Sequence, residues 1–218
     1  MFIINCKNYE EISGDKIIKF VKTAEMVSKK HKVKIAVAPP QHLLGIVSKN
    51  TIPILAQHVD DSRVGSTTGF VVPELLKKSK ISGSLINHSE HRIQSKEIEK
   101  LVLKLRDLKM ISVLCVKDVA EARKYVKLNP DYIAIEPPEL IGSGKAISKE
   151  KPEIITKAAK VVKEAKNNTQ LLCGAGIVSG EDVAKAIELG SKGILVASGI
   201  IKAKNWNKIM SDFAKSMV

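Results

Sequence analysis

Short apolar runs alternate with longer amphipathic stretches along the whole chain. Within most runs the apolar residues are continuous rather than alternating with polar ones, which is typical of parallel strands covered on both faces. The pattern predicts eight strands, at residues 2–5, 34–38, 54–57, 84–87, 111–116, 132–136, 170–174 and 193–197.

The stretches between the runs have the spacing of helices. Residues 98–108 and 154–165 place apolar side chains three and four positions apart, which predicts helices with one buried face. Ser179, followed three residues later by Asp182, has the spacing of a capping box and predicts a helix start. A last helix is predicted around residues 206–213, and the helices at 41–48 and 73–80 are predicted to be brief.

The order of these elements favours one fold. Eight strand–helix units in 218 residues leave about 27 residues for each, close to the shortest that close an α/β barrel of the (β/α)8 type. No linker or shift in composition divides the chain, so residues 1–218 are predicted to form a single barrel domain. A doubly wound open sheet is the rival fold. Its G-x-G-x-x-G fingerprint is missing, because the glycines from Gly174 to Gly180 include one residue too many.

Composition narrows the classes of partner. The net charge of +13 favours anions, but an aromatic content of 4% is too low for base-stacking platforms and argues against nucleic acid. No apolar run reaches the ~18 residues that a membrane helix needs. The first residues contain no secretory signal, and the three widely spaced cysteines are typical of free thiols in a reducing cytosol. We therefore expect a cytoplasmic location and no membrane or nucleic-acid partner.

Three predicted strands end in side chains that packing does not require. Lys7 follows the first strand. Either its ammonium neutralises a phosphate or an oxyanion, or its aliphatic stem simply packs over the rim of the barrel. His88 precedes a short helical turn, which favours a neutral imidazole that donates to a carbonyl, although a histidine in a loop is more often simply exposed. Glu136 is either a base at a strand exit or a surface carboxylate before a Pro-Pro turn. Asn5 is either part of this site or a strand cap, and Glu90 either orients Lys7 or caps the turn.

The loops after the last two strands are rich in small residues. In this fold, these two loops commonly supply bare backbone amides to a phosphate. A tight turn at a barrel corner would explain the small residues of either loop alone. A phosphate site explains why both loops have them. No metal site is predicted, because the pair His88 and His91 has no further ligand at suitable spacing. The candidate phosphate-binding residues here are Gly174, Gly176, Ala197 and Ser198.

Together, a lysine, a histidine, a glutamate and two phosphate loops at one end of a barrel describe an aldose–ketose isomerase for a small sugar phosphate. Another phosphate-binding barrel enzyme, such as a Schiff-base aldolase or a tryptophan-pathway isomerase, is one alternative. The aldolase needs an inward lysine that the late strands lack. A non-catalytic binder of anions or nucleic acid is the other alternative, and it leaves the histidine and the glutamate unexplained.

Five short motifs resemble those of the triosephosphate isomerase family, in the same order along the chain. The resemblance covers essentially the whole sequence. The motifs are Asn5-Cys6-Lys7 for the family's N-x-K, Ala56-Gln57 for A-Q, His88-Ser89-Glu90 for H-S-E, Ala134-Ile135-Glu136-Pro137 for A-x-E-P, and Ile141-Gly142-Ser143-Gly144 for I-G-T-G.

The resemblance implies a reaction and a role for each matching residue. Dihydroxyacetone phosphate and D-glyceraldehyde 3-phosphate would be interconverted, as in glycolysis and gluconeogenesis, with no metal or organic cofactor. Glu136 would be the base, His88 the neutral electrophile, and Lys7, placed by Asn5, the cation for enediolate and phosphate; a Glu base with a neutral His is a known feature of this isomerase. Residues 138–144 would form a lid. The resemblance adds Ile141 and Gly142 to the phosphate site.

The departures from the family pattern point to its compact archaeal branch. Asn87 stands where glycine is common, and the lid reads Pro-Pro-Glu-Leu-Ile-Gly instead of Pro-Val-Trp-Ala-Ile-Gly. Cys6 stands where tryptophan is frequent, and the eighth loop has Ala197-Ser198 where Gly-Gly is usual. Members of this branch are commonly homotetramers, and the resemblance implies that Thr68 contacts a neighbouring subunit near its site.

Overall fold

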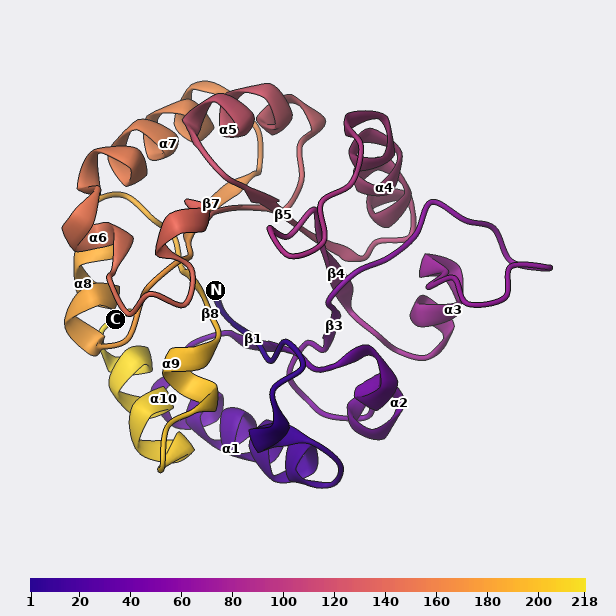
Figure 1. Cartoon of the computed structure of the whole chain (residues 1–218), viewed down its shortest axis with the longest axis horizontal. Helices are drawn as coiled ribbons and strands as arrows, with labels where there is room; N and C mark the ends of the chain where they lie inside the picture. Colours follow the sequence, from indigo (N-terminus) through magenta and orange to yellow (C-terminus); the bar gives the residue numbers. More distant parts are fainter.

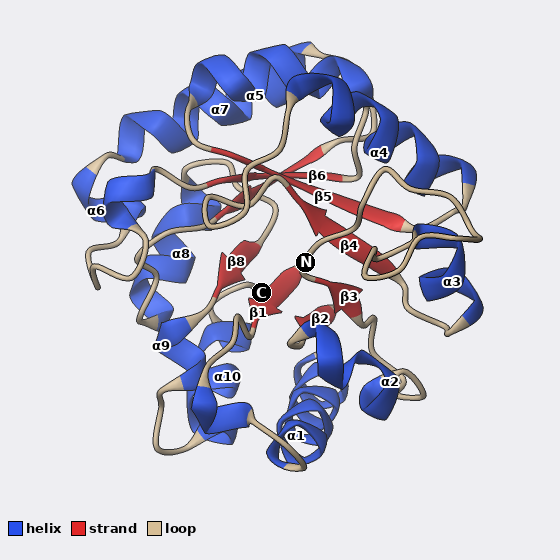
Figure 2. Ribbon diagram, turned by 45° about the vertical axis from the view of Figure 1, so that its right-hand side comes forward, coloured by secondary structure: helices blue, strands red, loops and turns tan.

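Eight parallel strands form a nearly closed barrel with helices around its outside (Figures 1 and 2). The computed structural model describes all residues 1–218. The strands pair in the order β2-β1-β8-β7-β6-β5-β4-β3, and a parallel bridge between Val37 and Ile54 joins β2 to β3. The predicted (β/α)8 barrel is confirmed. The strands are β1 Phe2–Asn5, β2 Ile35–Ala38, β3 Leu55–Ala56, β4 Gly83–Ile86, β5 Ile111–Val116, β6 Tyr132–Ile135, β7 Gln170–Cys173 and β8 Ile194–Val196.

The helices follow the predicted pattern, including the brief ones after β2 and β3. The predicted capping box is present at the start of α8, where Ser179 Oγ accepts the N–H of Asp182 at 3.2 Å and Asp182 Oδ2 accepts the N–H of Ser179 at 3.0 Å. None of the helices combines the length and apolar character needed to cross a membrane. The helices are α1 Lys16–His31, α2 Leu44–Val47, α3 Pro73–Lys78, α4 Ser95–Asp107, α5 Val119–Tyr125, α6 Ile147–Glu150, α7 Pro152–Glu164, α8 Gly180–Glu188, α9 Ser198–Ile201 and α10 Trp206–Lys215.

The apolar core has two layers. A cluster of 52 buried residues fills the space between the barrel and the helices. A second cluster of 10 residues, all from the strands, packs inside the barrel and includes Ile3, Leu85, Ala134, Leu172 and Leu195. Since strand side chains alternate between faces, the residue two positions after each of these also points inward. At the open end of the barrel these residues are Asn5, Asn87, Glu136, Gly174 and Ala197.

The three cysteines lie within the protein. Cys6, Cys115 and Cys173 are free thiols, as their spacing predicted, and all three are buried. Cys6 takes the position where the family often has tryptophan, and its side chain belongs to the larger core cluster. Cys6 therefore packs in the core between the barrel and the helices, on the face of the chain opposite to Asn5.

Candidate active site

Lys7 is held in an unusual backbone conformation at the exit of β1. Its φ is 45°, in the left-handed region that residues other than glycine rarely adopt. Asn5 Oδ1 accepts the N–H of Lys7 at 2.9 Å, and Gln57 Nε2 donates to the carbonyl oxygen of Lys7 at 2.8 Å. Asn5 and Gln57 thus fix the backbone of Lys7 from both sides.

The ammonium of Lys7 is also anchored. Its side chain is 12% exposed, and Nζ lies 2.5 Å from Glu90 Oε1. The alternative of a stem that only packs over the rim does not account for this contact of the ammonium with Glu90. Glu90 contacts Lys7, which is one of the two roles that its position in the sequence left open. Gln57 had appeared only as part of a motif. Its contact with Lys7 spans β2, which lies between β1 and β3, so it depends on closure of the barrel.

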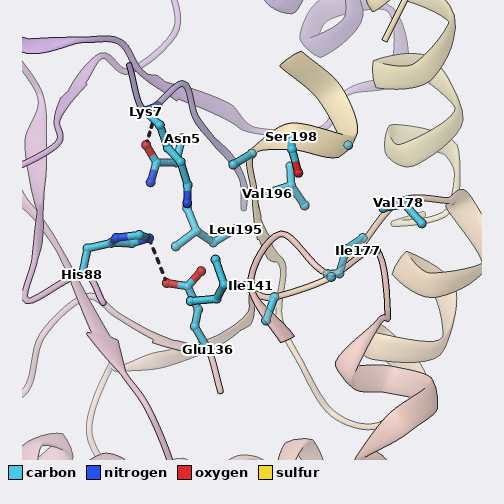
Figure 3. A pocket seen from close by; sticks show the side chains of 15 residues that line it. Asn5, Lys7, His88, Glu136, Ile141, Ile177, Val178, Leu195, Val196 and Ser198 are labelled. Atoms are coloured by element: carbon cyan, nitrogen blue, oxygen red, sulfur yellow. Dashed lines mark hydrogen bonds and ion pairs between the residues drawn. The ribbon is translucent and has the colours of Figure 1, made fainter. Parts of the chain in front are cut away.

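The hydrogen bonds of His88 determine which ring nitrogen faces the site. Its Nδ1 accepts the backbone N–H of Glu90 at 3.2 Å. Because an accepting nitrogen carries no proton, the neutral ring carries its proton on Nε2. That nitrogen points toward Glu136, with Nε2 3.7 Å from Oε2 (Figure 3). His88 is buried rather than exposed, and it presents an N–H donor to the pocket.

Asn87 explains how the chain turns from β4 to His88. Its φ of 62° is left-handed, and asparagine tolerates this region better than most residues. Asn87 Nδ2 donates to the carbonyl oxygen of Cys115 at 3.1 Å, and Oδ1 accepts the N–H of Ile93 at 3.2 Å. The amide thus replaces the conformational freedom of glycine with two fixed contacts.

Glu136 is a desolvated carboxylate. The residue is 6% exposed, and its Oε2 has no hydrogen-bond partner. Burial raises the pKa of the Glu136 carboxyl, while His88, the thiol of Cys115 and Lys7 act in the opposite direction. A poorly solvated carboxylate is a stronger base than one in water, which suits the removal of a carbon-bound proton.

Gly174 provides the space for that carboxylate. A Cβ at this position would lie 2.4 Å from Glu136 Cγ and 2.8 Å from Oε1. The N–H of Gly174 donates to the carbonyl oxygen of Ile135 at 3.1 Å and is engaged in strand pairing. The sequence predicted that this amide binds a phosphate. In the structure the amide is already hydrogen-bonded to Ile135, and Gly174 lies against the side chain of Glu136.

Backbone amides from two loops form the far side of the pocket. Gly176 has a φ of 72°, and a Cβ there would lie 1.8 Å from the carbonyl oxygen of Lys145, so the loop after β7 packs directly on the segment that follows Gly144. Ser198 and Gly199 begin α9, where the first N–H groups of a helix have no intrahelical partner. These amides are available to an anion.

One pocket gathers most of the predicted site (Figure 3). In the figure, Lys7, Asn5, His88 and Glu136 lie to the left of Ser198, and the ring of His88 points toward the carboxylate of Glu136. Ile141 also lines it, whereas Gly142 and Gly174 do not. Thr68 is exposed on the loop between β3 and α3, which extends away from the barrel in Figure 1. Five apolar lining residues were missed, because they resemble ordinary strand and loop residues in sequence: Ala175, Ile177, Val178, Leu195 and Val196.

The arrangement has the parts for moving a proton next to a carbonyl. A base, an N–H donor and a cation lie on one side, and bare amides suited to a phosphate lie on the other. No group of three or more His, Cys, Asp or Glu side chains is arranged to hold a metal ion.

Comparisons with known proteins agree with this geometry. A family model described as triosephosphate isomerase matches residues 1–213. A triosephosphate isomerase from Cenarchaeum symbiosum is 56% identical over 217 residues, which cover 100% of this chain and 97% of that protein. The triosephosphate isomerase of Methanothermus fervidus is 44% identical over 218 residues, which cover 100% of this chain and 98% of that protein. That of Methanocaldococcus jannaschii is 40% identical over 216 residues, covering 99% of each chain. The chain belongs to the triosephosphate isomerase family.

Proposed function

We propose that this chain interconverts dihydroxyacetone phosphate and D-glyceraldehyde 3-phosphate, using Glu136 as the base. The observation that carries the proposal is the placement of the Glu136 carboxylate. It is buried, its Oε2 has no hydrogen-bond partner, and it lies 3.7 Å from Nε2 of His88 in a pocket that also holds Lys7.

The side chains divide the proton transfer between them. Glu136 removes a proton from C1 of dihydroxyacetone phosphate, and the electron pair of that C–H bond forms the C1–C2 double bond. The carbonyl π electrons move to the C2 oxygen, which receives a hydrogen bond from Nε2 of His88 and faces the charge of Lys7. The proton of the C1 hydroxyl then moves to the C2 oxygen through the ring of His88, whose Nε2 gives its own proton to the C2 oxygen and takes the one from the C1 oxygen. Glu136 returns its proton to C2, and an electron pair of the C1 oxygen forms the C1 carbonyl. The carboxylate is regenerated, so no cofactor is required.

Binding of the phosphate is assigned to the amides opposite these side chains. The N–H groups of Gly176, Ser198 and Gly199, with the ammonium of Lys7, supply donors and positive charge. Residues 138–144 are proposed to close over the substrate and bring Ile141 and Gly142 to the phosphate. Closure excludes water, and it therefore suppresses loss of phosphate from the enediolate.

Proton NMR of dihydroxyacetone phosphate with the purified protein in deuterated water tests the proposal. We expect glyceraldehyde 3-phosphate to appear, with deuterium at the carbon that exchanges its proton. Folded protein that yields neither product nor deuterium incorporation would refute the proposed reaction. Product without deuterium would leave the isomerisation intact and argue against exchange of the Glu136 proton with solvent.

Replacing Gly174 with Ala is expected to lower kcat by roughly tenfold to a hundredfold, because the new Cβ displaces the Glu136 carboxylate and small misplacements of a catalytic group are costly. Steady-state kinetics measure this effect. Gly45→Ala is the matched control, since no atom lies within 4 Å of a Cβ at Gly45. Wild-type kcat in Gly174→Ala would contradict the proposed clearance between Gly174 and Glu136.

We also propose that the protein is a homotetramer that acts in the cytoplasm. The loop between β3 and α3 exposes 52% of Val64 and 56% of Phe70, and these side chains, near Thr68, suit burial against a neighbouring subunit. The free cysteines suit a reducing compartment. Sedimentation equilibrium is expected to give four chains per particle. A stable monomer at micromolar concentration would overturn the proposed assembly.

A further inference from the structure

A polar hollow lies beside the active site. It shares Asn5, Lys7 and His88 with the active-site pocket, and none of its lining residues is hydrophobic. Within it, the rings of His58 and His91 stack, with centroids 3.9 Å apart and an angle of 15° between their planes. His91 lies only three residues after His88, and the proton-transfer scheme above gives it no task.

His58 is a fixed platform for this stack. Its side chain is 12% exposed, and Nε2 lies 3.2 Å from Oδ1 of Asp60. The other carboxylate oxygen of Asp60 accepts the N–H of Val71 at 2.6 Å, which closes the base of the long loop after β3. Gln41 Nε2 donates to the carbonyl oxygen of His58 at 2.9 Å. Both the ring and the backbone of His58 are therefore held in place.

His91 ends the turn that carries the catalytic histidine. Its N–H donates to the carbonyl oxygen of His88 at 2.8 Å. The same turn contains Glu90, which contacts Lys7 through its carboxylate and His88 through its backbone N–H. The turn is thus attached to the β1 side by the contact between Lys7 and Glu90, and to the β3 side by the stack of His91 on His58.

We propose that His91 is a positioning residue for the isomerisation, and that its ring, stacked on His58, holds residues 88–91 so that Nε2 of His88 faces Glu136. This inference rests on the proposed function, since it assigns His88 to the substrate carbonyl. His91 is exposed apart from the stack, so its removal leaves the apolar core intact.

The charges around the two stacked rings make the stability of the stack depend on pH. Two imidazolium rings at this separation repel each other, which disfavours a second proton on the pair. Burial lowers the pKa of His58, and His91 lowers it further, whereas Asp60 of the same loop and Glu97 of α4 act in the opposite direction.

Four further titratable groups line the same hollow, namely Lys7 on the β1 side, His42 on the β2 side, and His88 and Glu90 on the turn itself. Because the pKa of His58 is lowered on folding, the stacked arrangement is fully stable above the ordinary histidine pKa and loses stability as pH falls below it.

Two substitutions at position 91 test the inference, with kcat and KM measured across the pH range in which histidine titrates. His91→Ala is expected to lower kcat by roughly tenfold with a smaller change in KM, because a misplaced electrophile affects the transition state more than substrate binding. His91→Phe, which restores an aromatic ring without a charge, is expected to recover most of this loss and to keep its activity to lower pH than the wild type. Wild-type kcat in His91→Ala, or no recovery in His91→Phe, would overturn the inference.

A readout that is independent of activity separates this inference from the proposed function. The ring-proton resonances of His88 are expected to move in His91→Ala and to stay unchanged in His42→Ala, a histidine of the same hollow that is not in the stack. An inactive wild type with this pattern would refute the proposed function and leave the positioning of His88 by His91 standing. Unchanged His88 resonances in His91→Ala would refute the positioning even in an active enzyme.

Discussion

Replacing Glu136 with Gln is expected to lower kcat by roughly 10²- to 10⁴-fold, the range typical of removing a general base. Glutamine has nearly the same shape but does not accept the C1 proton at neutral pH. The expected loss appears in kcat more than in KM, since the carboxylate acts on the transition state. Steady-state kinetics in both directions of the reaction measure it, and deuterium incorporation should fall in proportion.

The same substitution is expected to leave the protein at least as stable as the wild type. Burial raises the pKa of Glu136 in the folded protein, so the ionised carboxylate is disfavoured there relative to the unfolded chain. That cost is absent below the unfolded pKa of glutamate and is fully present once the pH exceeds the folded value. Removing the charge at neutral pH removes the cost. Thermal unfolding measures this difference and distinguishes a chemical defect from a folding defect.

Near wild-type turnover in Glu136→Gln would show that Glu136 is not the base. A large loss of turnover accompanied by a large fall in melting temperature would instead contradict the view of Glu136 as a desolvated group that costs stability. The two measurements therefore test the chemical role and the electrostatic origin of that role separately.

Replacing Lys7 with Ala is expected to lower kcat/KM by roughly 10²- to 10³-fold, comparable to the loss of one preorganised group that stabilises an oxyanion. It is also expected to weaken the binding of a phosphorylated carboxylate that mimics the enediolate. Both effects follow from removing a cation that is held by its backbone and by Glu90. Inhibition constants and calorimetric titration measure the binding, and circular dichroism verifies the fold.

Lys100→Ala provides the matched control. Lys100 Nζ lies 2.6 Å from Asp61 Oδ2 in an ion pair on the surface, outside the active-site pocket. Such exposed pairs contribute little to stability, so the loss of one lysine charge there should change neither turnover nor inhibitor affinity. Equal effects of the two substitutions would mean that general electrostatic attraction, rather than the position of Lys7, accounts for anion binding. Unchanged affinity in Lys7→Ala would remove Lys7 from the site.

The strands were predictable because burial on both faces leaves a continuous apolar run. β1 and β5 have the predicted bounds, whereas β3 is shorter than the run at 54–57. The difference lies at its two ends. Ile54 lies in an isolated bridge to Val37, outside the strand. The side chain of Gln57 donates to the carbonyl oxygens of Lys7 and Ala38. Contacts with neighbouring strands therefore set the length of β3.

Lys7, His88 and Glu136 were predictable as a group, because a polar residue at the end of a buried strand is unusual and three of them fall at one end of a barrel. The contacts that hold these side chains in place were not predictable. The sequence left open whether Asn5 capped its strand and whether Glu90 oriented Lys7. The hydrogen bond from the N–H of Lys7 to Asn5 is local to the end of β1, whereas the contact between Lys7 and Glu90 exists only once β1 and β4 share the same barrel mouth.

The sequence by itself determined the order of the strands and helices, the barrel, the family, and the residues at the strand ends, since all of these depend on local pattern and spacing. Only the tertiary structure decided that Gly174 makes room for Glu136, that Nε2 of His88 faces that carboxylate, and that His91 stacks on His58. These contacts join residues from different strand–helix units. Their geometry depends on closure of the barrel, which brings distant segments together at distances that no local pattern encodes.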